Sequence, residues 1–311
     1  MTLTELKYIV AVARERHFGR AAEACFVSQP TLSVAIRKLE EELDVTIFER
    51  GGAEVSMTSI GLRLIEQAQK ILEESDNFKA IARQGQDPLN GPLRVGIIYT
   101  VAPYLLPSLV PEQIKLTPNM SLVLQENYTV RLLELLRQGE IDAAIIALPL
   151  TDNSFMVREL YSEPFLVAVP KNHKWAQREV VDAAELKEET MLLLGAGHCF
   201  RDQVLDVCPE LSRFSASSEG IQRTIEGSSL ETIRHMVATG IGVTVLPATA
   251  LNASAQDSAL LSYIPFKEPV PTRHIALVWR KSFTRMAAIN SLAQAIVQCH
   301  LPNVDYATIY E

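Results

Sequence analysis

The sequence predicts an α/β protein with an all-α winged helix-turn-helix domain at its N-terminus. Apolar residues recur with helical spacing in three segments between residues 3 and 45, and a tight polar connection separates the second segment from the third. From residue 93 onward, short apolar strands alternate with amphipathic helical segments. This alternation is typical of an α/β domain with mainly parallel sheets.

The composition indicates a globular cytoplasmic protein. The chain has 311 residues, of which 48% are hydrophobic, enough for two or three domains with substantial cores. We find neither a signal-peptide pattern nor an apolar run of about 20 residues, so we expect a cytoplasmic protein without a membrane segment. The net charge of −8 argues against bulk affinity for nucleic acid but allows a locally basic reading surface.

The N-terminal domain is predicted to span residues 1–60. Helices are expected over residues 3–15 and 19–25, and a third begins after Ser28, with Pro30 accepted in its first turn. Residues 47–57 resemble a small hairpin, the wing. The third helix has an apolar stripe, which should be its buried face: Leu32, Ala35, Ile36, Leu39 and Leu43.

The polar start of the third helix is the candidate DNA-reading surface. In a helix-turn-helix this turn enters the major groove, where Gln29, Thr31 and Ser33 would face base edges. Arg50, at the tip of the wing, would reach the phosphate backbone or the minor groove. The complete set of candidate DNA-binding residues is Ser28, Gln29, Pro30, Thr31, Ser33, Arg37 and Arg50. The alternative is an ordinary three-helix domain with a polar surface.

A long helix is predicted over residues 58–84, followed by a hinge at residues 85–92 that holds two glycines and two prolines. Its apolar seam has the spacing of a coiled coil, which favours dimerisation, although so short a seam could also pack on its own domain. The seam consists of Leu64, Ala68, Ile71, Ser75, Phe78 and Ala82.

Residues 93–311 are predicted to form the α/β region. The expected helices cover residues 129–138, 230–239 and 283–299. The expected strands cover residues 93–100, 121–127, 141–148, 165–170, 191–195, 223–227, 242–247, 261–266 and 274–280.

The segment Gly195–Pro209 holds two of the four cysteines, Cys199 and Cys208. If residues 199–208 form a helix, their nine-residue separation places the two cysteines about 13.5 Å apart along its axis. A disulfide requires Cα atoms within about 7 Å, so the segment can hold the helix or the bond but not both. The helix N-terminus, His198 and Arg201 should make Cys199 the more acidic thiol. The alternative is that both cysteines are small core residues.

Polar residues follow the predicted strands at positions where a ligand could bind. Thr100 ends the first strand, Thr129 follows the second, and His198 and Cys199 follow the strand at residues 191–195. Sites in open α/β sheets lie beyond the carboxyl ends of strands, so these side chains should converge on a cleft. Helix capping is the alternative role for Thr129, and an ordinary core or surface position is the alternative for His198. We expect no metal and no cofactor, because neither a metal-ligand spacing nor a phosphate loop is present.

Two motifs carry a family resemblance. The stretch HFGRAAEACFVSQPTLSVAIRKLEEEL, followed by IFER and MTSIG, resembles the winged helix-turn-helix of LysR-type transcriptional regulators. Together with GHCFRDQVLDVC, it resembles the peroxide-sensing members of that family. The resemblance implies two α/β subdomains like those of periplasmic binding proteins, here residues 93–163 with 268–300, and residues 164–267. The chain would cross between them near Glu163 and Lys267.

The same resemblance implies a sensor mechanism. Hydrogen peroxide would oxidise Cys199, the peroxidatic residue, and Cys208 would resolve the product to a disulfide, while Thr100 and Thr129 help to hold the peroxide. The implied partners are promoter DNA, RNA polymerase and a thioredoxin- or glutaredoxin-type reductant. The family dimerises through its long helix and usually forms a dimer of dimers.

Two alternatives to this function stay open. A LysR-type regulator gated by a small metabolite would use the same cleft and keep both cysteines as structural residues. A thiol peroxidase would turn over peroxide repeatedly, but residues 1–83 would then have no explanation. We therefore expect a regulator and not an enzyme.

Overall fold

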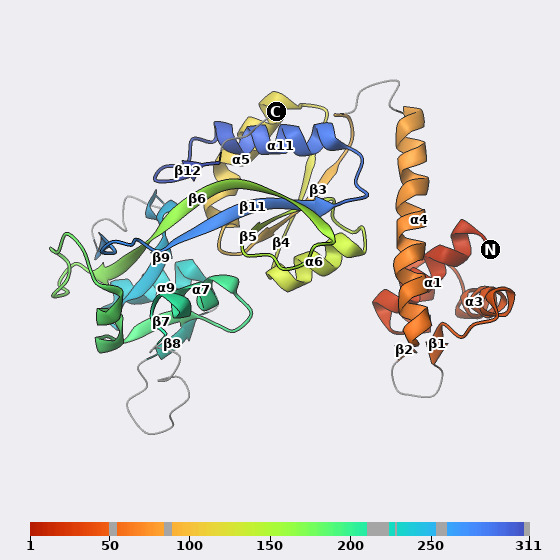
Figure 1. Cartoon of the computed structure of the whole chain (residues 1–311), viewed down its shortest axis with the longest axis horizontal. Coiled ribbons are helices and arrows are strands. Elements are labelled where there is room, and N and C mark those ends of the chain that lie inside the picture. Colours follow the sequence, from red (N-terminus) through yellow and green to blue (C-terminus); the bar gives the residue numbers. More distant parts are fainter. Residues whose placement is uncertain (50–54, 84–88, 210–223, 228, 253–259, 308–311) are drawn as a thin grey trace. The chain divides into compact units, whose positions relative to one another are not determined.

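The chain divides into two compact units, one holding the N-terminal helices and the other nearly all of the α/β region (Figure 1). The computed structural model describes residues 1–49, 55–83, 89–209, 224–227, 229–252 and 260–307. Within these ranges no helix is long and apolar enough to cross a membrane.

The first unit begins with three helices, as the sequence predicts. They are α1 (Leu3–Glu15), α2 (Phe18–Ala24) and α3 (Gln29–Leu43). Thr2 begins α1 with a capping box, and the Ser28 hydroxyl caps α3 by accepting a hydrogen bond from a backbone N–H of its first turn. The predicted helix-turn-helix order is confirmed.

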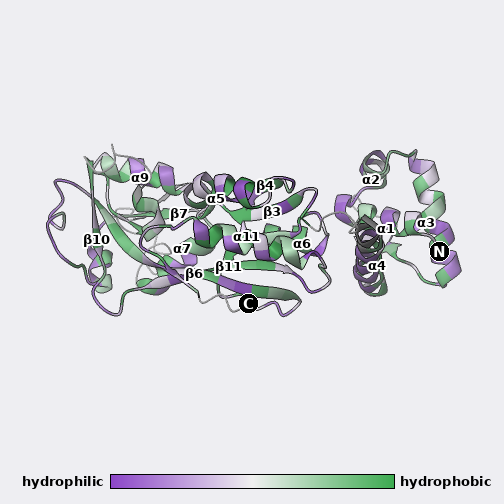
Figure 2. Cartoon of the chain, turned by 90° about the horizontal axis from the view of Figure 1, so that it is seen from above, coloured by the Kyte–Doolittle hydropathy of each residue, from purple (hydrophilic) through white to green (hydrophobic). Residues whose placement is uncertain are grey.

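The core of this unit lies between α1 and the inner face of α3. Leu32, Ile36 and Leu39 are fully buried there. Hydrophilic and hydrophobic residues alternate along α3, as expected for a helix with one buried face (Figure 2). Leu43 is 37% exposed, so its place in the predicted stripe is wrong: it is the last residue of α3, beyond the end of the core.

A two-stranded hairpin follows α3, in agreement with the predicted wing. Its strands β1 (Phe48–Glu49) and β2 (Ser56–Met57) pair antiparallel. The Glu40 carboxylate accepts hydrogen bonds from the backbone N–H groups of Ile47 and Phe48, which fixes the wing to α3. The tip of the wing, including Arg50, lies outside the described residues.

The long helix α4 (Ser59–Arg83) packs its first half on its own unit. Ala68 is 1% exposed within the N-terminal core, and Leu64 and Ile71 pack against that core. The first half of the predicted coiled-coil seam therefore serves its own domain, while Phe78 further along is 76% exposed. Residue 84 of the predicted long helix and residues 85–88 of the predicted hinge lie outside the described residues.

A mixed eight-stranded sheet forms the frame of the second unit. Its strand order is β10–β6–β11–β5–β3–β4, and β9 and β12 also pair with β6. The strands are β3 (Leu93–Ile98), β4 (Leu122–Asn127), β5 (Ala143–Ala147), β6 (Phe155–Pro170), β9 (Thr244–Pro247), β10 (Leu261–Pro265), β11 (Thr272–Arg280) and β12 (Asp305–Tyr306).

The prediction of mainly parallel sheets is wrong. In this sheet only β3 pairs parallel with its neighbours β4 and β5, and every pairing of β6 and β11 is antiparallel. The reason is that β6 is one 16-residue strand. Up to Pro164 it pairs with β11, and from Phe165 onward with β9, so the chain crosses between two halves within a single strand.

Helices cover both faces of the β3–β4–β5 half. Helices α5 (Ala102–Leu116) and α11 (Met286–Gln298) lie on one side, and α6 (Thr129–Arg137) on the other (Figure 1). The sequence prediction omits α5, whose interior contains Pro107 and Pro111, residues that normally interrupt a helix. The apolar face of α5 packs against α11 and is buried despite these prolines.

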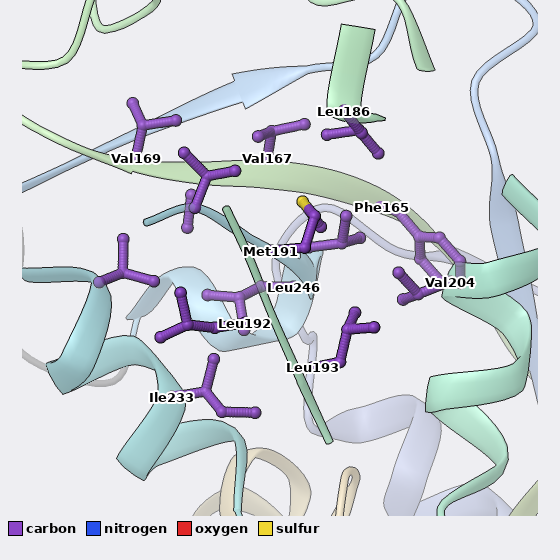
Figure 3. Packing of buried hydrophobic residues seen from close by; sticks show 14 of the residues in the cluster. Phe165, Val167, Val169, Leu186, Met191, Leu192, Leu193, Val204, Ile233 and Leu246 are labelled. Carbon is purple, nitrogen blue, oxygen red and sulfur yellow. The ribbon is translucent and has the colours of Figure 1, made fainter. Parts of the chain in front are cut away.

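The other half is built around a small parallel sheet of β7 (Met191–Leu194) and β8 (Thr224–Gly227). Helices α7 (Cys199–Val207) and α9 (Leu230–Ala238) and the 3-10 helices at Ala183–Glu188 and Ala248–Asn252 surround it. One apolar cluster joins these elements to the second half of β6 (Figure 3).

Candidate functional site

The two central cysteines lie at opposite ends of α7. Cys199 is the first helical residue and half-buried, and Cys208 is the C-cap. Neither cysteine forms a disulfide bond. Helical geometry places them about 13.5 Å apart along the helix axis, beyond the reach of a disulfide. The prediction that this segment forms a helix with separated cysteines is confirmed.

Cys208 belongs to the apolar core, where it is 1% exposed. Phe200 and Val204 of the same helix are 2% exposed in this cluster, and Val204 lies beside Phe165 of β6 (Figure 3). The core therefore holds the reduced helix in place. Cys208 can reach Cys199 only if this part of α7 leaves its packing.

An aromatic cluster surrounds the residue before Cys199. The His198 ring is 6% exposed and lies 4.8 Å from the Tyr128 ring and 5.9 Å from the Tyr99 ring, measured between centroids. Tyr99 and Tyr128 directly precede Thr100 and Thr129 in the chain. The ends of β3 and β4 therefore meet the N-terminus of α7, as the sequence predicts.

Thr129 carries a hydroxyl oxygen that is buried and has no hydrogen-bond partner among the described residues. It is the first residue of α6, where a threonine that capped the helix would bond a backbone N–H. Helix capping therefore does not explain this side chain. A buried hydroxyl without a hydrogen-bond partner destabilises the fold, unless a ligand or a water molecule supplies the missing hydrogen bond.

Thr100 belongs to a buried ionic network. Its Oγ1 and its carbonyl oxygen each accept a hydrogen bond of 3.0 Å from the Arg273 guanidinium. Arg273 pairs with Glu163 at 2.8 Å, and both side chains are fully buried. The second oxygen of Glu163 accepts from the Thr249 hydroxyl and backbone N–H, at 2.7 and 3.1 Å. Charges this deep are stable only when they are paired and hydrogen-bonded.

The same guanidinium connects the network to α7. The Arg273 carbon lies 4.9 Å from the centre of the Phe200 ring, the residue next to Cys199. Phe200 also packs edge-on against Phe165 at 5.1 Å. Arg273 therefore holds Thr100 from one side and the first turn of α7 from the other.

Arg201 fixes α7 to the strand before it. Its guanidinium donates a 2.8 Å hydrogen bond to the carbonyl of Leu194, the last residue of β7. In the middle of the helix, the Gln203 amide donates at 3.0 Å to the carbonyl of Leu148, in the other half of the unit. Arg201, the cation that the sequence places near Cys199, therefore bonds to the backbone of β7.

A second polar link joins the two halves of this unit. The Tyr104 hydroxyl of α5 donates a 2.7 Å hydrogen bond to Glu231 of α9. Glu231 also pairs with Arg234, which donates to the carbonyl of Ala250. Burial, with the neighbouring Glu231 carboxylate, raises the pKa of Tyr104 well above its usual value. The phenol therefore stays protonated and keeps donating.

A pocket of about 1260 Å³ lies beside α7. One wall is formed by Gln203, Asp206 and Val207 of that helix, and another by the chain from Lys267 to His274. Since α7 forms a wall, any refolding of the helix changes the pocket. Within the described residues no group of histidine, cysteine and acidic side chains could hold a metal ion.

The candidate DNA-binding residues lie on the surface of α3 and its cap. Ser28, Gln29, Pro30, Thr31 and Arg37 are exposed, and Ser33 is half-buried. The hydroxyls of Ser28 and Thr31 hydrogen-bond each other at 2.7 Å, so part of their capacity is used in capping. Gln29 is the first residue of α3.

The sequence prediction missed the network partners of Thr100, namely Glu163 and Arg273. Glu163 was singled out only as a crossing point of the chain, and Arg273 precedes a predicted strand. The sequence offered one indication: at both positions a charged residue stands directly beside an apolar strand segment. Their 110-residue separation hid the pairing.

The N-terminal fold and the two-halved α/β unit define a class of DNA-binding regulators, and comparison with family models agrees. The model described as "Bacterial regulatory helix-turn-helix protein, lysR family" matches residues 3–62. The model described as "LysR substrate binding domain" matches residues 86–299. The chain belongs to the LysR family of transcriptional regulators, which are not enzymes.

Within that family the chain is similar to OxyR proteins. It is 40% identical over 296 residues to the DNA-binding transcriptional dual regulator OxyR of Escherichia coli K12, covering 95% of both chains. A full-length OxyR variant from Pseudomonas aeruginosa is 45% identical with a TM-score of 0.81, covering 100% of this chain and 99% of that one. A hydrogen-peroxide-bound OxyR variant from Corynebacterium glutamicum is 33% identical with a TM-score of 0.62, covering 96% and 92%.

Proposed function

We propose that this protein is a hydrogen-peroxide-sensing transcriptional regulator of the OxyR type, switched by a reversible disulfide between Cys199 and Cys208. The observation that carries the proposal is the placement of the two thiols at opposite ends of one short helix. One of them lies beside a polar site and the other in the core. Their joining requires refolding, which converts a chemical event into a change of shape.

The first chemical step takes place at the N-terminus of α7. The Cys199 thiolate attacks one oxygen of hydrogen peroxide, the O–O bond breaks, and sulfenic acid and hydroxide form. The positive end of the helix dipole favours negative charge at this position. Thr129 offers an unpartnered hydroxyl to the peroxide. Thr100 Oγ1 already accepts from Arg273, so its own proton is free to be donated.

The second step needs movement of the chain. Cys208 leaves the core, its thiolate attacks the Cys199 sulfur, and the sulfenic oxygen departs as hydroxide or water. A nine-residue helix has little stability without its tertiary contacts. The free energy of the disulfide therefore has to exceed mainly the burial of Phe200, Val204 and Cys208.

The refolded segment passes its signal to the DNA through the oligomer. We infer a dimer formed through α4 and assembled as a dimer of dimers, in which the oxidised regulatory units reorient the winged domains on promoter DNA. RNA polymerase recruitment would follow. A thioredoxin- or glutaredoxin-type reductant in the cytoplasm would restore both thiols.

One titration tests the whole proposal. Purified full-length protein is treated with increasing hydrogen peroxide, the disulfides are mapped by mass spectrometry, and footprints are recorded on the protein's own promoter region. Formation of the Cys199–Cys208 bond should parallel the change in footprint. A footprint that changes with no disulfide, or a disulfide with an unchanged footprint, would contradict it.

Gln29→Ala should reduce the affinity for the operator by about 5- to 150-fold. This range corresponds to the loss of one good base contact, about 1–3 kcal/mol of binding free energy. Gln29 is exposed at the start of α3, where it can reach a base edge. Binding to unrelated duplex DNA should change little. Fluorescence anisotropy with operator and unrelated duplexes gives both affinities, and equal losses on both would contradict base readout.

Arg37→Ala is the control for this experiment. Arg37 is an exposed cation on the same helix, suited to a phosphate contact. Its removal should weaken binding to every sequence and lower the slope of log K against log salt by about one. The two variants therefore separate sequence reading from attraction to the backbone.

Val204→Ala should stabilise the oxidised form relative to the reduced form. Val204 is 2% exposed in the core that holds α7, so losing two carbons costs the reduced fold about 1.5 kcal/mol. For this two-electron couple the potential should become about 30 mV more negative. Equilibration against defined glutathione mixtures measures the shift.

Val237→Ala provides the matched control for the redox shift. Val237 is fully buried in the same cluster but belongs to α9, outside the segment between the cysteines. Both redox forms should lose stability equally, which leaves the potential unchanged.

Hydrogen exchange tests the refolding step itself. Oxidation should reduce the protection of the backbone amides over residues 199–208. Unchanged protection in protein with a complete disulfide would refute the refolding step.

A further inference from the structure

Helix α3 presents an apolar side chain at the centre of its solvent-facing surface. Val34 is 67% exposed, whereas Leu32 and Ile36 are fully buried. At about 100° of rotation per residue, Val34 lies about 160° from each of them and points directly away from the core. A single exposed valine is common on protein surfaces, but the surroundings of this one indicate a function.

The residues around Val34 are exposed and carry the positive charge that contact with DNA requires. Pro30, Thr31, Arg37 and Lys38 are exposed and lie within about 60° of Val34 around the helix. Arg37 and Lys38 bring two positive charges to this face, which complement phosphates on either side of a groove.

The acidic residues of α3 all lie in its C-terminal half. Glu41 is exposed about 20° from Val34 around the helix, but it lies about 10.5 Å further along the axis. Glu40 is turned toward the wing, where its carboxylate accepts from the backbone of Ile47 and Phe48. Glu42 is bound by the amino group of Met1 at 2.6 Å. The part of the helix that is suited to approach DNA is therefore its N-terminal half, which contains Val34.

The chemistry of valine selects one partner in the major groove. Its side chain offers two methyl groups and neither a donor nor an acceptor. Among the base edges exposed in that groove, only thymine presents a methyl group. The other base edges present donors or acceptors, which an apolar side chain would desolvate without replacing their hydrogen bonds.

We propose that Val34 is a specificity-determining residue that reads the 5-methyl group of one thymine in each operator half-site. The inference rests on the proposed DNA-binding function, because it requires α3 to lie in the major groove. It adds an apolar contact to the polar contact expected from Gln29. The operator should therefore contain a thymine whose methyl group matters more than its hydrogen-bonding edge.

Uracil substitution tests the proposal, because it removes the methyl group and nothing else. The operator is first selected by the full-length protein from a library of random duplexes, and each thymine is then replaced in turn by deoxyuridine. Wild-type protein should lose about fourfold in affinity at one thymine per half-site, the value of one buried methyl group. The Val34→Ser variant, which keeps a similar helix propensity, should bind both duplexes equally.

Val130→Ser is the matched control, since Val130 is 69% exposed on α6 and belongs to the other unit. It should discriminate thymine from uracil like the wild type. Wild-type protein that is indifferent to every uracil, or a Val34→Ser variant that still discriminates, would overturn the proposal. Failure to select any sequence from the library would instead refute the DNA-binding function itself, and with it this inference.

Discussion

The Cys199→Ser variant should show no change in promoter footprint at any concentration of hydrogen peroxide. The serine hydroxyl fits the same place at the start of α7 but cannot be oxidised to a sulfenic acid. Operator binding by the untreated variant should match that of the reduced wild type. Transcription from the target promoter in cells gives a second readout, and full induction by peroxide would refute the assignment of Cys199.

The other cysteines supply the controls for this prediction. Cys208→Ser should allow oxidation of Cys199 but stop at the sulfenic acid or a mixed disulfide. Cys25→Ser and Cys299→Ser should respond normally. Burial raises the pKa of Cys25, and it raises the pKa of Cys299 to about 11, so neither forms much thiolate near neutral pH.

The Glu163→Gln variant should lose about 3–5 kcal/mol of stability in the regulatory unit. The substitution preserves volume but leaves the Arg273 guanidinium buried without its counter-charge. The penalty is the uncompensated desolvation of that cation, so the loss should be far larger than for a surface pair. Urea unfolding followed by tryptophan fluorescence measures it, because the two tryptophans, Trp175 and Trp279, are both buried in this unit.

Glu134→Gln is the corresponding control. Glu134 pairs with Arg131 at 2.9 Å on the surface of α6, where both side chains are nearly half exposed. Its loss should cost no more than about 0.5 kcal/mol, because solvent screens the pair. Similar midpoints for the two variants would show that the buried pair contributes no more than an exposed one.

The sequence predicts local structure well where one periodicity dominates. The capped helix after Ser28, the strand at Met191–Leu194 and the helix after Cys199 all follow from patterns within about 15 residues. Helix α5 escaped prediction because its two prolines outweigh its apolar periodicity locally, while packing against α11 stabilises it. Strand direction escaped because it depends on which distant segment β6 pairs with.

The same distinction applies to the site. Cys199, Cys208 and His198 were found because they share one short segment. The role of Thr100 depends on Arg273, 173 residues away, and that of Arg273 on Glu163. A contact of this kind is specified by the topology of the crossing strands, which spacing along the chain does not reveal.

Because Cys208 is buried, there is an upper limit to the hydrogen peroxide concentration to which the protein can respond reversibly. After the first oxidation, the sulfenic acid waits for α7 to open before its partner thiol arrives. A second peroxide molecule competes during that interval and produces a sulfinic acid, which thiol reductants do not restore. The frequency of helix opening therefore decides whether a molecule is recycled or permanently lost. Tight packing of α7 stabilises the reduced protein, but it increases the fraction of protein molecules lost as sulfinic acid when the peroxide concentration is high.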